Sequence, residues 1–381
     1  MQIVNLTRPE METWHGPKYL IVYTTQSLDL ELLNKIHSEL PSLIIWGLSS
    51  FHGILLSDGF KRGIYGLLIE DEDNLELRVT AIDLSHTQNI REHVSEHLRK
   101  WGADYPNARS FFIHGTQGTE ERTIEAIHDV FSPSAQVFGA TAGYDKFLTE
   151  PFIFLNDTII SQGVLIIQML NNRFVCSIAC GGYMPTLNRG IVTASHGRVL
   201  ESIDNRPAVD VYNEWTDGMF EPYFKRGGML PRSCGLYPLG RTMPNEPDCG
   251  FWLCHPYFID PDAKSIHLFS EVPQGAEIQL MRGTESSIIT HIGNVIKNAL
   301  EQVEKSSVQA ALIMFCAGSA SIIADGMEIV CEQAKDAFGS IPFIGCTTYG
   351  EQGRLKNASQ DYHGNMMIEI VLLLKHIPAA E

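Results

Sequence analysis

The chain has 381 residues, of which 44% are hydrophobic and 19% are charged, and its formal net charge is -17 at pH 7. A chain of this length and composition buries a large core and exceeds one average domain, so we expect two domains. The negative charge repels the phosphates of nucleic acids and anionic lipid, so neither nucleic acid nor a membrane surface is an expected partner.

The first residues, the apolar runs and the cysteines predict a cytoplasmic protein. Residues 1–14 contain Arg8, Glu10 and Glu12 and no long apolar run, so they do not resemble a secretory signal. The longest apolar runs, such as residues 370–374, have the length of a strand and are far too short to span a membrane. Eight cysteines are spaced irregularly, several of them within strand-like runs, which favours buried thiols in a reducing compartment.

Three segments of the chain share one design. Each begins with an apolar strand, continues through a helical stretch and a proline, and ends in a second strand that closes on glycine and small residues. The segments cover residues 19–53, 111–143 and 311–350. A strand–helix–strand connection implies parallel pairing of the two strands with a right-handed crossover, so we expect three related α/β units.

The second strand of each unit runs into a loop bounded by glycines, at residues 47–53, 139–143 and 345–350. Glycine permits a positive φ and the close approach of a backbone or a ligand, although the same residues also suit a tight turn alone. Open α/β sheets hold ligands at the ends of their strands. We therefore expect the three loops to share a rim, and a ligand to lie where loops of the two domains meet.

Local patterns predict further elements in chain order. Runs rich in Val, Ile and Leu and bounded by Asp, Asn or Gly indicate antiparallel strands at residues 63–70, 75–84, 152–155, 163–170, 174–180 and 366–374. Apolar residues at helical spacing indicate helices at residues 90–101, 208–215, 288–303 and 322–338. Pro207 and Thr284 are typical of helix starts.

The expected fold is therefore α/β, with two domains of related strand-helix-strand units and mixed, partly parallel sheets. A stretch rich in glycine and proline, residues 222–250, interrupts the regular elements. We place the domain boundary there, with the first domain at residues 1–225 and the second at residues 226–381.

Several short motifs follow one another in a specific order and spacing, at residues 139–145, 156–157, 190–193, 204–208, 237–240, 272–276 and 342–351. In this order and spacing the chain resembles the FIST family, which pairs an N-terminal with a C-terminal FIST domain. The chain departs from the family's pattern in two places. Ser319 follows Cys316-Ala317-Gly318 where the family often has arginine, and Gly364 separates His363 from Asn365.

The resemblance implies a sensory module that binds a small-molecule or gaseous ligand. No transmitter domain is expected on this chain, so its output would pass to a separate signalling protein. Stand-alone FIST proteins resemble the NosP group, haem proteins that sense nitric oxide and regulate a partner histidine kinase. The resemblance thus implies a haem-based nitric oxide sensor in a two-component system, and a homodimer stays open as its assembly.

Haem requires an axial ligand beside an apolar pocket, and His255 is the main candidate for that metal ligand. It lies in the aromatic segment 251–258, where Trp252 and Tyr257 supply flat side chains and Pro256 restricts the backbone. A histidine packed among aromatic residues without a ligand is the alternative. His52, His114 and His363 are further candidates, whereas His93, His97 and His128 are typical of a charged helix surface.

The loops offer polar groups as well. His52 and Gly53 lie in the first loop, and Thr348 and Tyr349 supply hydroxyls from the third. These groups would suit a non-haem sensor for a small polar metabolite such as an amino acid, which is the alternative function. A protein that binds only another chain is a third interpretation.

Two other chemistries are less favoured by the sequence. Cys234, Cys249, Cys254 and His255 are of the residue types that bind zinc, but their spacing does not match a compact pattern of paired cysteines. No nucleophile elbow, phosphate-binding loop or metalloprotease motif is present in the sequence, so we expect no enzyme.

Overall fold

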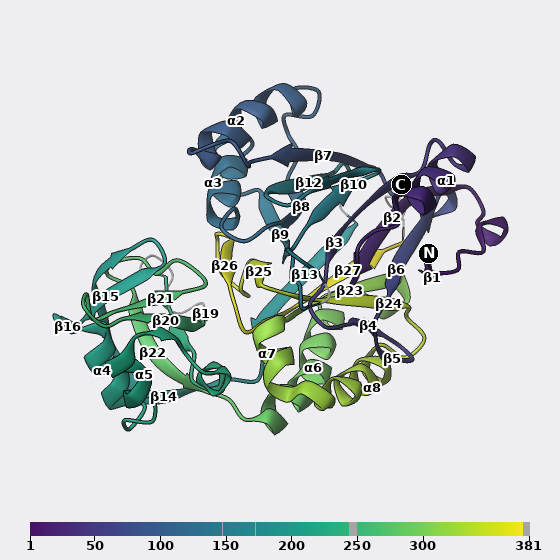
Figure 1. The fold of residues 1–381 in the computed structure, drawn as a ribbon. Helices are drawn as coiled ribbons and strands as arrows, with labels where there is room; N and C mark the ends of the chain where they lie inside the picture. Colours follow the sequence, from purple (N-terminus) through teal and green to yellow (C-terminus); the bar gives the residue numbers. More distant parts are fainter. Residues whose placement is uncertain (147, 172, 244–249, 376–381) are drawn as a thin grey trace.

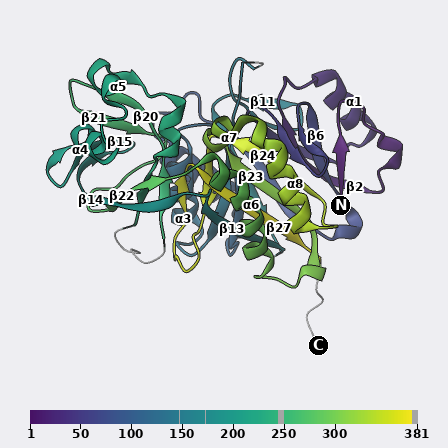
Figure 2. The same ribbon diagram turned by 90° about the horizontal axis from the view of Figure 1, so that it is seen from below.

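The computed structural model describes residues 1–146, 148–171, 173–243 and 250–375. It confirms the predicted fold class: three six-stranded sheets and one nine-stranded sheet, most of them mixed, are combined with helices. The three six-stranded sheets form a large body, and the nine-stranded sheet forms a smaller body beside it (Figures 1 and 2).

The first sheet is built around the parallel pair β2 and β3, which helix α1 (Leu30–Glu39) connects. Its strands, in spatial order, are β1 (Gln2–Asn5), β6 (Ile64–Glu70), β2 (Pro17–Thr24), β3 (Ile44–Ser49), β10 (Ile153–Leu155) and β11 (Thr158–Ile160).

The second sheet repeats this plan around β8 and β9, which helix α3 (Glu120–Val130) connects, and α2 (Ile90–Trp101) packs beside α3. Its strands, in spatial order, are β26 (Tyr362–Gly364), β25 (Gly350–Gly353), β9 (Gln136–Thr141), β8 (Ser110–Gly115), β12 (Gly163–Met169) and β7 (Leu77–Asp83).

The third sheet is built around β23 and β24, which α7 (Ala317–Ile323) and α8 (Met327–Phe338) connect, and α6 (Glu285–Leu300) packs against α8. Its strands, in spatial order, are β13 (Phe174–Cys180), β27 (Met367–Leu374), β23 (Val308–Cys316), β24 (Phe343–Thr348), β4 (Ile54–Leu56) and β5 (Gly59–Lys61).

Each unit gives a hairpin to the sheet of another unit. The hairpin β4–β5 follows β3 in the chain but pairs with β24 of the third sheet. The hairpin β10–β11 pairs with β3 of the first sheet, and β25–β26 pairs with β9 of the second. This cyclic exchange relates the three units by an approximate three-fold arrangement and joins segments far apart in the sequence.

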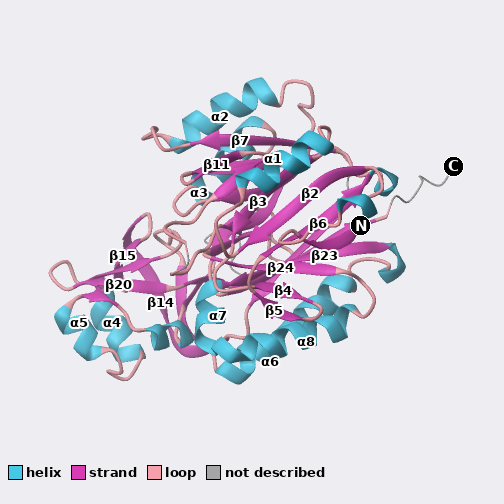
Figure 3. Cartoon of the chain, turned by 45° about the vertical axis from the view of Figure 1, so that its right-hand side comes forward, coloured by secondary structure: helices cyan, strands magenta, loops and turns pink. Residues whose placement is uncertain are grey.

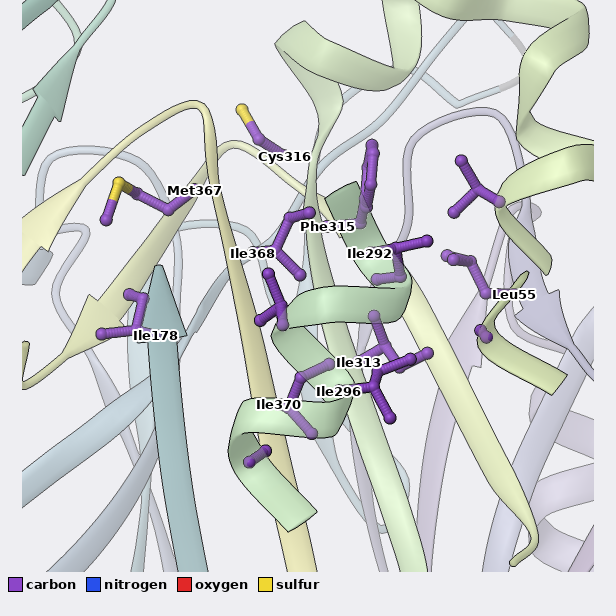
Figure 4. Close-up of a cluster of buried hydrophobic side chains, with 14 of the residues drawn as sticks. Leu55, Ile178, Ile292, Ile296, Ile313, Phe315, Cys316, Met367, Ile368 and Ile370 are labelled. Carbon is purple, nitrogen blue, oxygen red and sulfur yellow. The ribbon is translucent and has the colours of Figure 1, made fainter. Parts of the chain in front are cut away.

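Helices cover the outer faces of the three sheets, and the inner faces meet in a shared core (Figure 3). Alternate residues of one strand therefore enter different cores: Ile21 and Tyr23 of β2 face the shared core, while Leu20 and Val22 pack with α1. In the third unit, Ile292 and Ile296 of α6 pack on the outer face of the sheet beside Ile313 (Figure 4).

The smaller body packs two helices against its sheet, α4 (Ala208–Trp215) and α5 (Glu221–Arg226). Its strands, in spatial order, are β17 (Gly228–Met229), β20 (Pro256–Asp260), β21 (Ser265–Leu268), β15 (Val199–Ile203), β14 (Met184–His196), β22 (Glu277–Arg282), β18 (Leu239–Arg241) and β19 (Trp252–Cys254), with β16 (Arg206–Pro207) paired to β15.

Two predicted helix features had different outcomes. Thr284 caps α6, and its side chain accepts a hydrogen bond from the backbone N–H of Ser287, as the sequence predicted. The helix predicted near residues 322–338 is present as α8, which begins at Met327. Residues 322 and 323 belong instead to α7, which ends where Ala324 adopts a backbone with φ of 42°.

Candidate functional site

The three glycine-bounded loops meet in a ring of backbone hydrogen bonds. The N–H of Phe51 donates to the carbonyl of Thr347 at 3.0 Å, and the N–H of Gly143 donates to the carbonyl of Ser49 at 2.9 Å. The N–H of Tyr349 closes the ring by donating to the carbonyl of Thr141 at 3.0 Å. Each strand end thus bonds to the loop of another unit, and the three loops share one rim.

Side chains strengthen the contact between the first and third loops. The Ser50 hydroxyl accepts a hydrogen bond from the Thr347 N–H at 2.8 Å and lies 3.2 Å from the Thr347 hydroxyl. The Thr347 hydroxyl donates to the Phe51 carbonyl. Because these groups are buried and satisfied, the rim is a fixed platform, and its hydroxyls are used in holding the loops together.

A cavity of about 540 Å³ lies where the rim, the start of α7 and the smaller body meet. We call it the aromatic pocket. Its lining residues are Phe51, Gln117, Tyr144, Met229, His255, Phe269, Cys316, Ala317, Gly318, Ser321, Tyr349 and Asn365.

Aromatic side chains from the three loops and the smaller body wall this pocket. The ring centroid of Tyr349 lies 6.1 Å from that of Phe51 and 5.9 Å from that of Tyr144. The Tyr349 hydroxyl donates to the Tyr144 carbonyl at 2.5 Å, which fixes its ring. Elsewhere in the lining, the ring centroids of His255 and Phe269 lie 5.5 Å apart. Such walls suit a flat, largely apolar ligand.

His255 presents a neutral imidazole to this pocket. Burial lowers its pKa to about 4, because desolvation disfavours the charged form. Among the described residues, neither ring nitrogen has a hydrogen-bond or charged partner. A neutral imidazole with an uncommitted nitrogen can accept a proton from a ligand, donate one, or bind a metal ion that a ligand carries.

Two glycines leave room for this imidazole. A Cβ on Gly318 would lie 3.2 Å from His255 Nδ1, and one on Gly235 would lie 3.5 Å from Nε2. The Gly318 contact would be tighter than ordinary van der Waals packing. A larger residue at position 318 would therefore press on the ring and alter the pocket at the nitrogen that faces α7.

Asn365 adds a second uncommitted polar group to the lining. Its side chain is 2% exposed, and its Nδ2 donates to the Tyr349 carbonyl at 2.9 Å. Its Oδ1 has no hydrogen-bond partner among the described residues. A buried acceptor without a hydrogen-bond partner destabilises the folded protein, because its desolvation is not compensated. A ligand that donates a hydrogen bond to this oxygen would remove that cost.

The structure brings only two of the predicted site residues, His255 and Tyr349, into the lining of this pocket. Tyr257 lies one layer behind it, stacked on Phe269 with 4.3 Å between ring centroids. Trp252 is buried in the core beside Tyr362, at 5.8 Å between ring centroids, and is not part of the lining.

The remaining predicted residues serve the rim. His52 adopts φ of 61°, with its ring 3.8 Å from the Phe51 ring and its Nδ1 3.3 Å from Asp145. Gly53 packs against Phe60, since a Cβ there would lie 2.6 Å from the Phe60 ring. Thr348 is buried, and its hydroxyl donates to Glu351 at 2.5 Å.

The other histidine candidates are buried away from the pocket. His114 lies inside the shared core beside Tyr23, at 5.9 Å between ring centroids. His363 Nδ1 lies 3.0 Å from the Gln352 amide nitrogen, and its Nε2 lies 3.3 Å from the Phe269 carbonyl.

A zinc site finds no support in the described part of the chain. The proposed ligand Cys249 lies outside the described residues. Cys234 lies 3.2 Å from the Tyr212 hydroxyl, and Cys254 lies 3.1 Å from Arg241 Nε. Within the described ranges, no three His, Cys, Asp or Glu side chains gather in a way that could hold a metal ion.

Sequence reasoning missed several lining residues. Cys316, Gly318 and Asn365 were noted only as neighbours of the two departures from the family's pattern, and the structure places all three in the pocket. Phe51 lies in the first predicted loop and Tyr144 directly follows the second, but neither was predicted as a site residue. Phe269 carried no sequence signal, because it reaches the pocket only through the packing of the smaller body against the rim.

The fold and the pocket define a protein of three related α/β units with a cavity where their loops meet a smaller body. The family model of the FIST N domain matches residues 18–206, and that of the FIST C domain matches residues 208–354. The chain belongs to the FIST family. FIST domains are generally sensory domains that bind small ligands in signalling proteins.

Other comparisons add little to this identification. None of the curated proteins compared matches the chain. A solved chorismatase structure is similar over 97% of each chain, with 10% identity and a TM-score of 0.34. No helix within the described ranges has the length and apolar character needed to cross a membrane.

Proposed function

We propose that the aromatic pocket is the sensory site, that it binds haem with His255 as the axial ligand, and that the protein senses nitric oxide without catalysing a reaction. The observation that carries this proposal is the neutral, uncommitted imidazole of His255 between aromatic walls. Histidine must be neutral to bind a metal, and a pKa of about 4 keeps His255 neutral throughout the physiological range.

The donor set therefore fits haem. Haem would supply an iron centre that binds the gas, while the protein supplies the axial imidazole and a pocket of limited polarity. Phe51, Phe269 and Tyr349 would pack on the flat ring and exclude water from it. The signal would pass to a separate histidine kinase.

The test is the visible absorption spectrum of the protein after reconstitution with haemin. We expect a haem spectrum in the parent and a weakened or shifted one in His255→Ala. His267→Ala is the matched control, because His267 lies in the neighbouring strand β21 and contacts Tyr257 without lining the pocket. A featureless visible spectrum of the reconstituted parent would remove haem from the proposal, and an unchanged His255→Ala spectrum would remove His255.

The second candidate is a non-haem sensor for a small polar metabolite such as an amino acid. The unpartnered Oδ1 of Asn365 favours it, because an ammonium or amide group would satisfy that acceptor. A thermal-shift screen of the common amino acids tests it. A true ligand at 10 to 100 times its dissociation constant stabilises by about 1.5–3 kcal/mol, and Asn365→Leu should abolish that shift.

A further inference from the structure

We propose that Arg232 is the anion-binding residue of the aromatic pocket, and that the ligand is a flat ring system bearing a carboxylate. This inference rests on the proposed function only in placing a ligand in this pocket. The carboxylate could belong to haem, whose ring carries propionates, or to a small aromatic acid, and the test below distinguishes these sources.

Arg232 stands at the edge of the pocket. It begins a short 3-10 helix (Arg232–Leu236), and its Nε donates to the Ser321 hydroxyl at 2.6 Å. Ser321 lines the pocket from α7. Its hydroxyl therefore tethers the guanidinium beside the cavity.

The positive charge of Arg232 also acts on His52. Burial lowers the pKa of His52, and the positive charges of Arg62, Arg232 and Lys146 lower it further, against the raising effect of Asp145. His52 packs on Phe51, which lines the pocket. The Arg232 charge is therefore felt by a residue that packs directly on the lining.

The terminal nitrogens of Arg232 remain available. Among the described residues, Arg232 makes no ion pair, and only its Nε forms a hydrogen bond. The neighbouring Arg62 differs, because both of its terminal nitrogens contact the Asp145 carboxylate, at 2.8 and 3.4 Å. A guanidinium fixed through Nε presents two N–H groups in the geometry that a carboxylate accepts.

The lining of the pocket favours an anion as well. None of its described lining residues is acidic, although the chain carries 45 acidic and 28 basic residues. A second cavity, of about 400 Å³, shows the contrast, because Glu121, Glu125, Glu271 and Asp361 line it. Among the described residues, an anion entering the aromatic pocket meets an arginine without an ion pair and no carboxylate in the lining.

The rest of the pocket defines the ligand's body. Phe51, Phe269 and Tyr349 offer aromatic faces to a flat ring, and the buried Oδ1 of Asn365 requires a donor. Together with Arg232, these groups describe a ring that carries a carboxylate at the mouth of the pocket and a hydrogen-bond donor inside it.

The experiment measures the dissociation constants of two acid–neutral pairs, haemin with its dimethyl ester and benzoate with benzamide, by spectroscopic titration and calorimetry. We expect Arg232→Gln to raise the dissociation constants of the two acids about 10- to 100-fold, because a charge-assisted contact is lost. The dissociation constants of the two neutral compounds should stay within about twofold of the parent values. Arg232→Lys should recover part of the affinity.

The control is Arg226→Gln on α5. Arg226 lies over the Tyr223 ring and not at the pocket, so its loss removes the same charge without touching the site. We expect it to leave every dissociation constant within about twofold. Unfolding curves should show that both glutamine variants fold like the parent.

The outcomes separate this inference from the proposed function. If Arg232→Gln binds both acids as the parent does, or if the parent prefers neither acid over its neutral counterpart, the inference is overturned. Haem binding that depends on His255 but not on Arg232 would leave the proposed function in place and reject the inference. Benzoate binding that depends on Arg232, without a haem spectrum, would do the reverse.

Discussion

His114 shows how a buried polar side chain links this protein's stability to pH. It lies in the shared core, and neither of its ring nitrogens has a partner among the described residues. Burial lowers its pKa from the usual 6.5 of a histidine to about 3. The unfolded chain therefore takes up a proton near pH 6.5, whereas the folded protein resists protonation until about pH 3.

The direction of the pH dependence of stability follows from this difference in pKa. Between about pH 6.5 and pH 3 the unfolded state binds more protons at this site, so the contribution of His114 to stability falls as the pH falls. Replacing His114 by Phe removes the titrating group and keeps a ring of similar shape. From pH 7 to pH 5 the parent should lose about 2 kcal/mol more than His114→Phe in the free energy of unfolding.

Urea unfolding at pH 7, 6 and 5 measures this difference. Between pH 7 and pH 8 the parent and His114→Phe should change in parallel, since His114 is neutral in both the folded and the unfolded chain there. Equal losses of stability in both proteins down to pH 5 would show that His114 is not held neutral in the folded state.

At the scale of elements, a glycine without a side chain allows the two parallel strands of a unit to lie close together. Gly47 pairs with Val22 and Gly139 with Ile113, and a Cβ on either glycine would lie within 2 Å of the facing carbonyl oxygen. Gly47→Ala should therefore destabilise the protein by about 1–3 kcal/mol or more, because backbone must move to admit the methyl group.

Gly293→Ala is the opposite case. Gly293 lies inside α6, where a Cβ would meet only Gln333, at 3.9 Å. Alanine there should stabilise the protein by about 0.5–1 kcal/mol through helix propensity. Thermal and urea unfolding of the two variants should move in opposite directions, and a neutral Gly47→Ala would contradict the close packing of β2 on β3.

A buried ion pair joins α3 to the smaller body. Arg198 donates to Glu120 at 2.7 Å and to Glu121 at 2.6 Å, and Glu120 is almost fully buried. Arg198→Met would leave the buried carboxylate of Glu120 and the partly buried carboxylate of Glu121 without their cation, and should cost about 3–5 kcal/mol.

Arg206→Met is the matched control for that substitution. Arg206 pairs with Glu214 at the surface, where both side chains are more than half exposed. Its loss should leave the free energy of unfolding almost unchanged, because solvent screens an exposed ion pair. Similar unfolding free energies for the Arg198→Met and Arg206→Met variants would show that the pair between α3 and the smaller body does not hold the two bodies together.

At the scale of the whole molecule, the sequence predicted the units but not their exchange of hairpins. Strand–helix–strand periodicity and the three loops of one design were local patterns, and the structure shows those units. The pairing of β4 with β24 joins residues almost 300 positions apart, and the short strand at Ile54–Leu56 carries no signal for its partner. The division at residues 225 and 226 stays a prediction about domains.

The lining residues of the pocket also differ in whether local sequence or long-range packing reveals them. His255 and Tyr349 were predictable because aromatic and glycine-rich neighbours marked them in the sequence. Phe269, Asn365 and Arg232 were not, because their roles depend on how the smaller body and the third unit pack around the rim. Thr348 stays a prediction as a ligand group, and the structure places it outside the lining of this pocket, with its hydroxyl donating to Glu351.

The proposed sensory ligand is haem, bound in the aromatic pocket. The most direct measurement is a crystal structure of the protein after reconstitution with haemin. We predict electron density for the ring between Phe51, Phe269 and Tyr349, with His255 on the iron and a propionate at Arg232. Density for haem at another place, such as the acid-lined cavity beside Glu271, with the aromatic pocket empty, would show that the aromatic pocket is not the haem site.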